Sequence, residues 1–586
     1  MTWLLQRVLD LVDIIITWFN RRRYGALARQ VGRDPDDRAT ADGRRGLILV
    51  QIDGLSHKTL VQAMDAGALP GLKRLLERDG YRLERWWCGL PSSTPVVQSG
   101  LMYGNNWDVP AFRWYDKESG RTWVAKNPRD ARELQDRLSE GRTGLLEGGS
   151  SYVNIFDGGA RLSLFTVSAL GGSRFFENVR GVSLVVLMLL SPLRLLRAIA
   201  AGGWEFVRDL WQRLAARFDT RVGRRRRPFS VPAALFQIFA SIVFRELQTF
   251  GVLLDIYRRV PAIYTNYYGY DDVAHQLGPL DGETLRVLRG IDARIHEIDV
   301  ARRRFADRRP YDLIVLADHG MSPCTSMKER YGQTLGELVA SLVAREDQEF
   351  VLDEGGSEVD RSDADARFLL AELEGIKANL APRGQKLVGV LENLLARRVP
   401  AEEVPEWDLT RHGDIILRNS GTISLVYFPL TAQRMDLSEI ELIYPGLLRG
   451  LEEHPGLGLV LGRQDGQAMA MTVRGPRHLN DLNDPTINDL LDNLPDKALV
   501  AGQLTRLLSF PSCGDLVVLG RWNSRGQTIA FEPHWATHGG LGGEQNHPFI
   551  LLPPDITWDM STITGPEDLY PLLMARYGRK GEREKG

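Results

Sequence analysis

The architecture of this chain can be predicted from the stretch Gly46-Leu-Ile-Leu-Val-Gln-Ile-Asp53-Gly54. Five of the six residues between Gly46 and Asp53 are apolar, and the run stops at an Asp-Gly pair. A strand that is buried on both faces has this continuous apolar pattern, whereas a half-exposed strand alternates between apolar and polar residues. The stretch therefore predicts an inner strand of a parallel sheet that ends in a polar loop.

Two further stretches repeat this design. One is Tyr311-Asp-Leu-Ile-Val-Leu-Ala-Asp318, and the other is Ala262-Ile-Tyr-Thr-Asn-Tyr-Tyr. Helical patterns lie between the strands, for example over residues 283–305. Strands that alternate with helices predict an α/β fold with a mainly parallel central sheet flanked by helices. Ligands of such sheets bind beyond the carboxyl ends of the strands, so we expect a functional site there.

The composition is that of an ordinary globular protein, with 586 residues, 43% of them hydrophobic and 25% charged. The net charge of −2 gives no overall positive field, so no nucleic-acid partner is expected. The three cysteines, Cys88, Cys324 and Cys513, are far apart and form no Cys-x-x-Cys pair. This spacing argues against a disulfide framework and against a thiolate zinc site, and it favours a reducing, cytoplasmic setting.

Two long segments are expected to interrupt the core. The sequence predicts an N-terminal apolar helix with a polar linker, three parts of the core, a mainly helical insertion, and an α+β insertion that acts as a lid or accessory subdomain. The corresponding ranges are 1–45 for the helix and linker, 46–127, 260–331 and 507–586 for the core, 128–259 for the helical insertion, and 332–506 for the lid.

Residues 3–19 and 181–244 contain apolar helical runs that are too short to span a bilayer. The second segment also contains the arginine cluster 224–227, and this combination is typical of a surface that meets anionic lipid. The pattern predicts peripheral contact with a membrane, on its inner face for a cytoplasmic protein. Docking of the same segments on the protein's own core explains the pattern equally well, and both interpretations stay open.

Carboxylates and imidazoles follow the predicted strands. Asp271 and His275 are four residues apart, so on a helix they share one face and can hold one metal ion. Asp318 and His319 are adjacent at the end of a strand, where a turn can direct both side chains into one site. Asp53 ends the first strand. Taken alone, each feature also suits a turn, a helix cap or a surface pair.

Two more segments carry candidate functional residues. His538 opens a loop with four glycines, which is typical of a chain that passes close to another group, whereas His547 precedes an apolar run and is interpreted as structural. Thr94-Pro95 precedes another apolar run, as expected of an N-cap followed by proline at the first helical position. A hydroxyl beside a metal at a helix N-terminus has a lowered pKa, and the backbone N–H groups there favour phosphate.

In this order, the segments resemble the alkaline phosphatase superfamily, specifically its type I phosphodiesterase and nucleotide pyrophosphatase branch. The resemblance spans residues 46 to about 555, with both insertions outside it. The matching motifs are Val50-Gln-Ile-Asp53-Gly54, Thr94-Pro95 with its following helix, Asp271-x-x-x-His275-x-x-Gly-Pro279, Ala317-Asp318-His319-Gly320-Met321 and Thr537-His538-Gly539.

The resemblance implies a phosphate-ester hydrolase with two divalent metal ions, for which mixed Asp and His ligands suit zinc, with manganese as an alternative. It also implies that Thr94 attacks phosphorus to form a phosphothreonine-like intermediate, which water then hydrolyses. Ser93 is the alternative nucleophile, because the family often has one residue between the nucleophile and the proline. The implied ligands are Asp53, Thr94, Asp318 and His319 for one ion, and Asp271, His275 and His538 for the other.

The substrate is the least determined feature. The family's phosphate-binding asparagine has no clear counterpart here, and Arg113, Asn105 and Asn106 are the candidates to replace it. The leading hypothesis is a phosphodiesterase or nucleotide pyrophosphatase that acts on a small or lipid-like phosphoester. There are four alternatives: a phosphomonoesterase, an enzyme acting on phosphonate or sulfate esters, a phosphoglycerate mutase-like enzyme, and a non-catalytic membrane-associated module that retains the fold.

Overall fold

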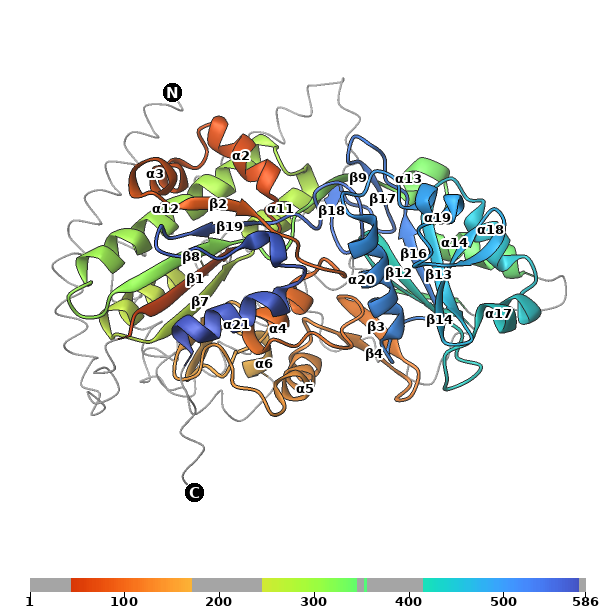
Figure 1. Cartoon of the computed structure of the whole chain (residues 1–586), viewed down its shortest axis with the longest axis horizontal. Coiled ribbons are helices and arrows are strands. Elements are labelled where there is room, and N and C mark those ends of the chain that lie inside the picture. Colours follow the sequence, from red (N-terminus) through yellow and green to blue (C-terminus); the bar gives the residue numbers. More distant parts are fainter. Residues whose placement is uncertain (1–43, 171–244, 345–351, 356–414, 579–586) are drawn as a thin grey trace, which may run out of the picture.

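A seven-stranded sheet forms the centre of the larger half of the molecule (Figure 1). The computed structural model describes residues 44–170, 245–344, 352–355 and 415–578. All three strands expected from the sequence are present in this sheet, and the α/β fold is confirmed. The strand order is β2 (Arg82–Arg85), β19 (Phe549–Leu552), β8 (Tyr311–Leu316), β1 (Gly46–Ile52), β7 (Ala262–Tyr267), β5 (Ser150–Tyr152) and β6 (Leu162–Leu164).

The strand β1 lies between β8 and β7 and pairs in parallel with both. All seven residues of β1 are buried, which explains why its sequence is almost continuously apolar. The strands β5 and β6 continue the parallel pairing beyond β7, whereas β19 runs antiparallel to β8 and β2. The carboxyl ends of β8, β1 and β7 therefore meet at one edge of the sheet.

Helices cover both faces of this sheet (Figure 1). On one face, α2 (His57–Asp65), α3 (Pro70–Asp79) and α12 (Gly282–Arg304) form a buried apolar cluster with Ile48 and Val50 of β1. On the other face, α4 (Thr94–Tyr103), α5 (Pro128–Ser139) and α21 (Pro566–Tyr577) pack with Leu47 and Leu49. Successive side chains of β1 thus point to opposite faces of the sheet and pack against two separate layers of helices.

A second seven-stranded sheet forms the other half of the molecule (Figure 1). Its pairs are antiparallel except for β10 with β11. The helices α14 (Leu335–Val343), α17 (Leu437–Ile443) and α18 (Leu447–Glu452) pack on one face, and α19 (Pro485–Leu490) and α20 (Lys497–Ser509) pack on the other. The strand order is β10 (Leu352–Gly355), β11 (Ile415–Ser420), β12 (Ile423–Tyr427), β16 (Leu516–Gly520), β13 (Leu457–Gln464), β14 (Gln467–Thr472) and β15 (Gly475–His478).

Small elements connect the two halves. The strand β9 (Ser322–Ser326) pairs with β17 (Thr528–Ala530) on one side and with β18 (Ala536–Thr537) on the other. A hairpin of β3 (Arg113–Asp116) and β4 (Arg121–Val124) contacts β11. The remaining short helices are α6 (Val167–Leu170), which packs on α5, α11 (Gly269–Leu277), which contacts β18, and α13 (Met327–Tyr331), which contacts β9.

The structure corrects two of the expected domain boundaries. The range 128–259 was expected to be a mainly helical insertion, yet it contributes β5 and β6 to the central sheet. These strands have only three residues each, too few to show a strand pattern. The boundary at 506 falls inside α20, and β16 beyond it is an inner strand of the second sheet rather than part of the first.

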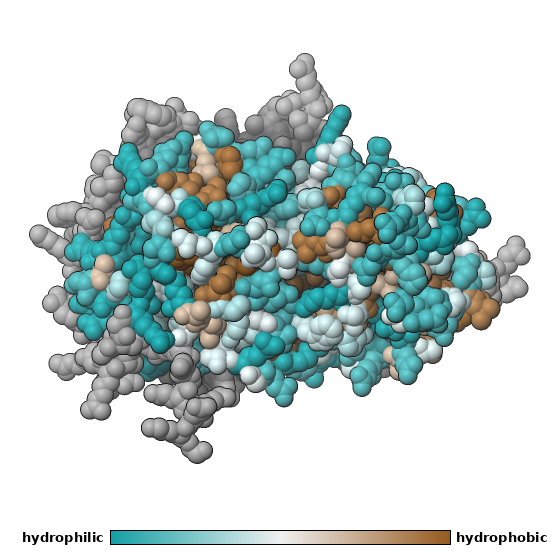
Figure 2. All heavy atoms as spheres, in the orientation of Figure 1, coloured by the Kyte–Doolittle hydropathy of each residue, from teal (hydrophilic) through white to brown (hydrophobic). Residues whose placement is uncertain are grey.

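The surface in Figure 2 is mostly hydrophilic, and its hydrophobic side chains lie in small separate groups. Among the described residues, no helix combines the length and the apolar character that a membrane span requires. The segments 3–19 and 181–244, for which we predicted lipid contact, lie outside the described residues. Their contact with a membrane therefore stays a prediction.

Candidate metal centre

The carboxyl edge of the central sheet brings the expected acidic residues together. Asp53 follows β1, Asp318 follows β8 after one residue, and Asp271 lies in the first turn of α11, which follows β7. Because β8, β1 and β7 are adjacent and parallel, the three carboxylates reach the same place from three separate segments. Their burial, at 5% exposure or less for Asp53 and Asp318, separates them from ordinary turn residues.

Asp53, Asp318 and His319 form the first of two groups. The Nε2 atom of His319 lies 3.5 Å from Asp53 Oδ1 and 3.4 Å from Asp318 Oδ2. One ligand atom from each residue lies within 4.8 Å of the others, so one cation fits among them. Gly54 donates its backbone N–H to Asp318 Oδ1 at 3.2 Å, which fixes the other oxygen of that carboxylate.

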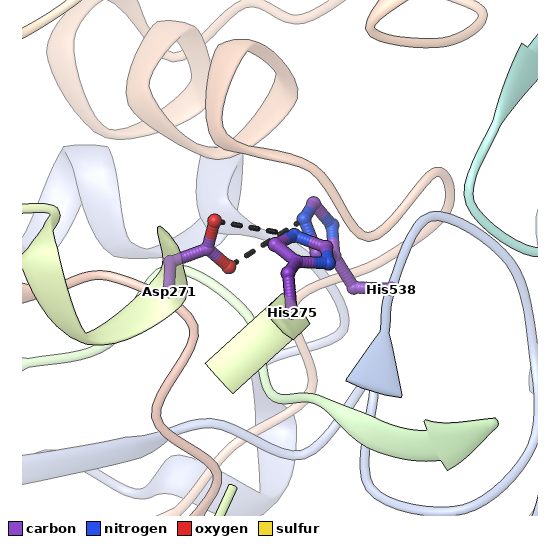
Figure 3. A group of neighbouring side chains, drawn as sticks. All are labelled: Asp271, His275 and His538. Carbon is purple, nitrogen blue, oxygen red and sulfur yellow. Dashed lines mark ion pairs between the residues drawn. The ribbon is translucent and has the colours of Figure 1, made fainter. Parts of the chain in front are cut away.

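Asp271, His275 and His538 form the second group (Figure 3). The two oxygens of Asp271 face different rings, with Oδ2 3.2 Å from His275 Nε2 and Oδ1 3.6 Å from His538 Nε2. Asp271 and His275 share a face of α11, as the four-residue spacing predicted. His538 follows β18 directly and is held in place because β18 pairs with β9, the strand that begins three residues after His319.

The two groups adjoin each other. The ring of His319, from the first group, stacks on the ring of His538, from the second, with centroids 3.7 Å apart. Gly54 lies between the groups at φ +76°, and a Cβ atom there would lie 2.6 Å from Asp271 Oδ1. The glycine after the first strand is thus required both by the turn and by the space beside Asp271.

The backbone hydrogen bonds of the three histidines direct each Nε2 atom toward the carboxylates of the centre. Their Nδ1 atoms lie within hydrogen-bond distance of backbone carbonyls, at 2.8 Å for His275 with Ala536, 3.0 Å for His319 with Gly320, and 2.8 Å for His538 with Ser92. Because carbonyls only accept, each Nδ1 atom carries a proton, which leaves Nε2 as the ring nitrogen that can bind a metal ion. A metal ion between these Nε2 atoms and the facing carboxylate oxygens would be attracted to both.

Buried atoms without hydrogen-bond partners point to the same conclusion. Asp271 Oδ1, His275 Nε2 and Asp318 Oδ2 are buried and have no such partner in the described part of the chain. Buried polar atoms are nearly always paired, so unpaired ones suggest an ion or another ligand. All three atoms belong to the two groups, and the donor set of carboxylate oxygen and imidazole nitrogen suits a divalent metal.

The electrostatics of the centre favour a bound cation. Burial and the charges of Asp318 and Asp271 raise the pKa of Asp53 well above its usual range. Burial and the neighbouring His319 lower the pKa of His538 well below its usual range, which keeps its ring neutral. The ammonium of Lys126 lowers the pKa of Asp53, and no sequence motif indicated that this lysine would be near the centre. Positive charge between the carboxylates would relieve their repulsion.

The hydroxyl of Thr94 faces the first group. Its Oγ1 atom lies 3.5 Å from Asp53 Oδ1 and 3.4 Å from His319 Nε2. The sequence suggested Thr94 as the N-cap, but the structure has Ser93 at that position and Thr94 as the first residue of α4. Ser93 makes no side-chain cap bond, and its buried Oγ atom has no hydrogen-bond partner among the described residues. Of the two hydroxyls, Thr94 is the one that contacts candidate ligands.

The structure does not bring Asn105 and Asn106 to the centre. They follow the C-terminal end of α4, about 15 Å along the helix from Thr94. Asn105 donates to the carbonyl of Leu138, and Asn106 donates to Glu567, so both amides hold connecting loops in place. Their role in binding phosphate stays a prediction.

Arg113 and His547 have different surroundings. Arg113 begins β3 and is 3% exposed, so its guanidinium lies inside the protein beside the hairpin. Its role in binding substrate stays a prediction.

His547 packs edge-on against Trp87 with ring centroids 5.1 Å apart, and burial lowers its pKa to about 4. It makes no contact with either group, in agreement with its interpretation as structural.

The glycine-rich loop after His538 passes close to the second sheet. A Cβ atom at Gly539, which has φ +115°, would lie 2.3 Å from the carbonyl oxygen of Ser420. A side chain at Gly320 is excluded by lack of space rather than by backbone conformation, because a Cβ atom there would lie 1.9 Å from the carbonyl oxygen of Glu544. The loop therefore seats His538 against β18 and the β11–β12 turn.

Among solved structures, the chain is similar to an inactive variant of murine ectonucleotide pyrophosphatase/phosphodiesterase 5 in complex with AMP, at 11% identity and a TM-score of 0.43 over 92% of this chain and 96% of that chain. It is also similar to phosphonoacetate hydrolase from Sinorhizobium meliloti in complex with phosphonoformate, at 16% identity and a TM-score of 0.41 over 91% of this chain and 96% of that one. Neither similarity assigns an activity or a ligand to this chain. No curated protein matches it.

A family model gives the stronger result. The model for type I phosphodiesterase / nucleotide pyrophosphatase matches residues 47–393, more than half of the 586 residues. The match includes Asp53, Thr94, Asp271 and Asp318, runs across the range 128–259 that we expected to lie outside the resemblance, and ends before His538. The chain belongs to the type I phosphodiesterase / nucleotide pyrophosphatase family.

Proposed function

We propose that this protein hydrolyses phosphodiesters or nucleotide pyrophosphates with two divalent metal ions and Thr94 as the nucleophile. Family membership supports a phosphoester hydrolase. The observation that carries the finer proposal is the position of Thr94 Oγ1, 3.4 Å from His319 Nε2 and 3.5 Å from Asp53 Oδ1, at the N-terminus of α4. A nucleophile in contact with one candidate metal group and close to a second is the arrangement that two-metal ester hydrolysis requires.

The residues fit the two metal ions. Asp53, Asp318 and His319 would hold the ion nearer Thr94, and Asp271, His275 and His538 would hold the other. The first group offers two carboxylates and one imidazole, and the second offers one carboxylate and two imidazoles. Such mixed ligands suit zinc, and manganese is the alternative. When bound, such ions lower the pKa of a coordinated hydroxyl and offset charge on phosphoryl oxygens.

The chain's own groups suggest the order of events. Thr94 Oγ1 forms a bond to phosphorus while the bond from phosphorus to the leaving oxygen breaks, and the hydroxyl proton leaves with the alcohol or phosphate product. Water then cleaves the phosphothreonine bond and restores the hydroxyl. The backbone N–H groups at the start of α4 favour the negative phosphoryl oxygens throughout.

Hydrolysis of bis-p-nitrophenyl phosphate and p-nitrophenyl phosphate by the purified protein tests the proposal. Activity should disappear on chelation and return with Zn²⁺ or Mn²⁺. Thr94→Ala should lower kcat by about a thousandfold or more, because the nucleophile is lost. Ser93→Ala is the matched control, one residue away and also buried, and should change kcat less than about tenfold.

The two substrates separate the diesterase from the monoesterase. A higher kcat/KM for the diester supports the proposal, whereas a higher value for the monoester assigns the same site to a phosphomonoesterase. Full activity of Thr94→Ala with loss in Ser93→Ala would transfer the nucleophile to Ser93. Absence of activity on both esters, with two metal ions bound, would reject general ester hydrolysis.

A further inference from the structure

The two oxygens of Asp53 have different surroundings. Oδ1 faces Thr94 Oγ1 and His319 Nε2, each at 3.5 Å. Oδ2 lies on the side of the sheet and accepts from Asn266 Nδ2 at 2.8 Å and from Gln51 Nε2 at 3.5 Å. A carboxylate that is held by one oxygen has a fixed plane, so its other oxygen is directed into the site.

The donors to Asp53 belong to a larger buried network. Gln51 lies two residues before Asp53 on β1, and its Oε1 atom accepts from Tyr264 at 2.6 Å and from Gln98 Nε2 at 3.2 Å. Asn266 lies two residues after Tyr264 on β7. Because side chains alternate along a strand, these groups project from one face of the sheet, the face that α4 covers.

Gln98 extends the network to the helix of the nucleophile. It lies one turn after Thr94 on α4, is fully buried, and also donates to Asn154 Oδ1 at 3.1 Å. Its Oε1 atom accepts from the backbone N–H of Ile155 at 2.8 Å. A buried glutamine with every hydrogen bond directed at a fixed partner holds its helix in one position, which an apolar side chain of the same size cannot do.

We propose that Asn266 and Gln98 are positioning residues of this centre. Asn266 fixes the plane of Asp53 as a metal ligand, and Gln98 ties the helix that carries Thr94 to the strand that ends at Asp53. The effect on turnover rests on the proposed function, whereas the effect on metal affinity rests only on metal binding by the two groups. Neither residue contacts the reacting atoms.

Metal titration tests the role of Asn266. Asn266→Ala in the full chain should weaken binding of one of two Zn²⁺ ions by about 10-fold to 100-fold, as measured by competition with a chelator, and leave the other ion unchanged. Asp53→Asn marks which of the two binding steps belongs to the Asp53 group. Unchanged Zn²⁺ affinity in a folded Asn266→Ala protein would overturn this part of the proposal.

A pair of glutamines tests the role of Gln98. Gln98→Met keeps the volume and removes the hydrogen bonds, so kcat for the diester should fall about tenfold with little change in KM. The matched control is Gln248→Met. Gln248 is also buried and bonds to a neighbouring strand of the same sheet, β7, through Thr265 Oγ1 at 3.3 Å and the Asn266 carbonyl at 3.2 Å, but it lies on the opposite face of the sheet.

The outcomes separate positioning from stability. Similar losses of stability in both glutamine variants, with kcat reduced only in Gln98→Met, support positioning. Equal effects of the two variants on kcat would overturn it for Gln98. A wild-type protein that binds two Zn²⁺ ions but hydrolyses neither ester would reject the proposed function, while the affinity of Asn266→Ala would still decide whether that residue positions a metal ligand.

Discussion

At the scale of single residues, Gly54 shows how tightly the centre constrains the chain. It turns the backbone after β1 at φ +76°, donates to Asp318, and leaves room for Asp271. The sequence suggested a turn from the Asp-Gly pair alone. That interpretation was right for the backbone, but no pattern within one strand could show that a residue more than 200 positions later fills the space beside it.

Gly54→Ala should therefore impair metal binding as well as stability. The left-handed backbone costs about 1–2 kcal/mol for alanine, and the added Cβ must displace Asp271, which should weaken the affinity of the Asp271 group for Zn²⁺ by about tenfold or more. Gly67→Ala is the control, because Gly67 has φ +72° and nothing within 4 Å of the added Cβ atom. Urea unfolding and chelator competition measure the two effects, and equal Zn²⁺ affinity in both variants would contradict the expectation.

At the scale of elements, local patterns predicted the parts of the site that lie on regular structure. Asp271 and His275 could be paired because both lie on one helix, and Asp53 and Asp318 could be placed because buried parallel strands have continuous apolar sequences. Asn266 lies inside such a strand, but its contact with Asp53 depends on strand register, which one sequence does not specify. The lid boundary failed for a similar reason, since pairing places β16 in the second sheet.

The C-terminal helix α21 is joined to β8 by a buried carboxylate. Asp312 on β8 is 1% exposed and accepts from Arg576 Nε at 2.9 Å and from Tyr577 at 2.8 Å, both on α21, and from Arg45 Nε at 2.6 Å. Burial alone would raise the pKa of Asp312, but these hydrogen bonds outweigh burial and lower it. The ionised form is thus favoured in the folded protein.

Asp312→Asn should destabilise the protein in a pH-dependent way. The folded pKa lies below the unfolded value of about 3.9, so ionised Asp312 stabilises the fold above that pH, and the stabilisation is lost as the pH falls through the folded pKa. We expect the variant to lose about 3 kcal/mol at neutral pH, and the difference from wild type should shrink below about pH 4. Urea unfolding at several pH values measures it. Asp65→Asn, at an exposed position, should show no such dependence.

At the scale of the whole molecule, one buried apolar cluster runs through both halves. It joins Leu47 and Leu49 of the central sheet to Leu425 and Leu461 of the second sheet. His538 is seated between the halves, because its loop passes against the β11–β12 turn. The second sheet thus supports the loop of His538, although it supplies none of the six candidate ligands. This contact could not be predicted from the sequence, which suggests that the second sheet is a separate lid.

The ion pair of Lys117 and Asp515 tests this connection. Lys117, in the turn of the β3–β4 hairpin, lies 3.1 Å from both oxygens of Asp515, with side-chain exposures of 6% and 0%. Asp515 also accepts the backbone N–H groups of Phe428 and Met435 at 2.7 Å. Removing one partner leaves a buried charge without its counter-ion, so the hairpin and the second sheet lose a shared contact.

Lys117→Met should lower the free energy of unfolding by about 3–5 kcal/mol. Urea unfolding should stay a single transition, because the shared apolar cluster still couples both halves.

Lys328→Met is the control. Lys328 makes an ion pair of the same 3.1 Å length with Glu337, but its side chain is 56% exposed, so its loss should cost less than about 1 kcal/mol. Two separate transitions in the wild-type protein, seen by fluorescence and circular dichroism, would show that the halves unfold independently. Equal losses in the two variants would show that burial of the Lys117 pair adds nothing to the connection.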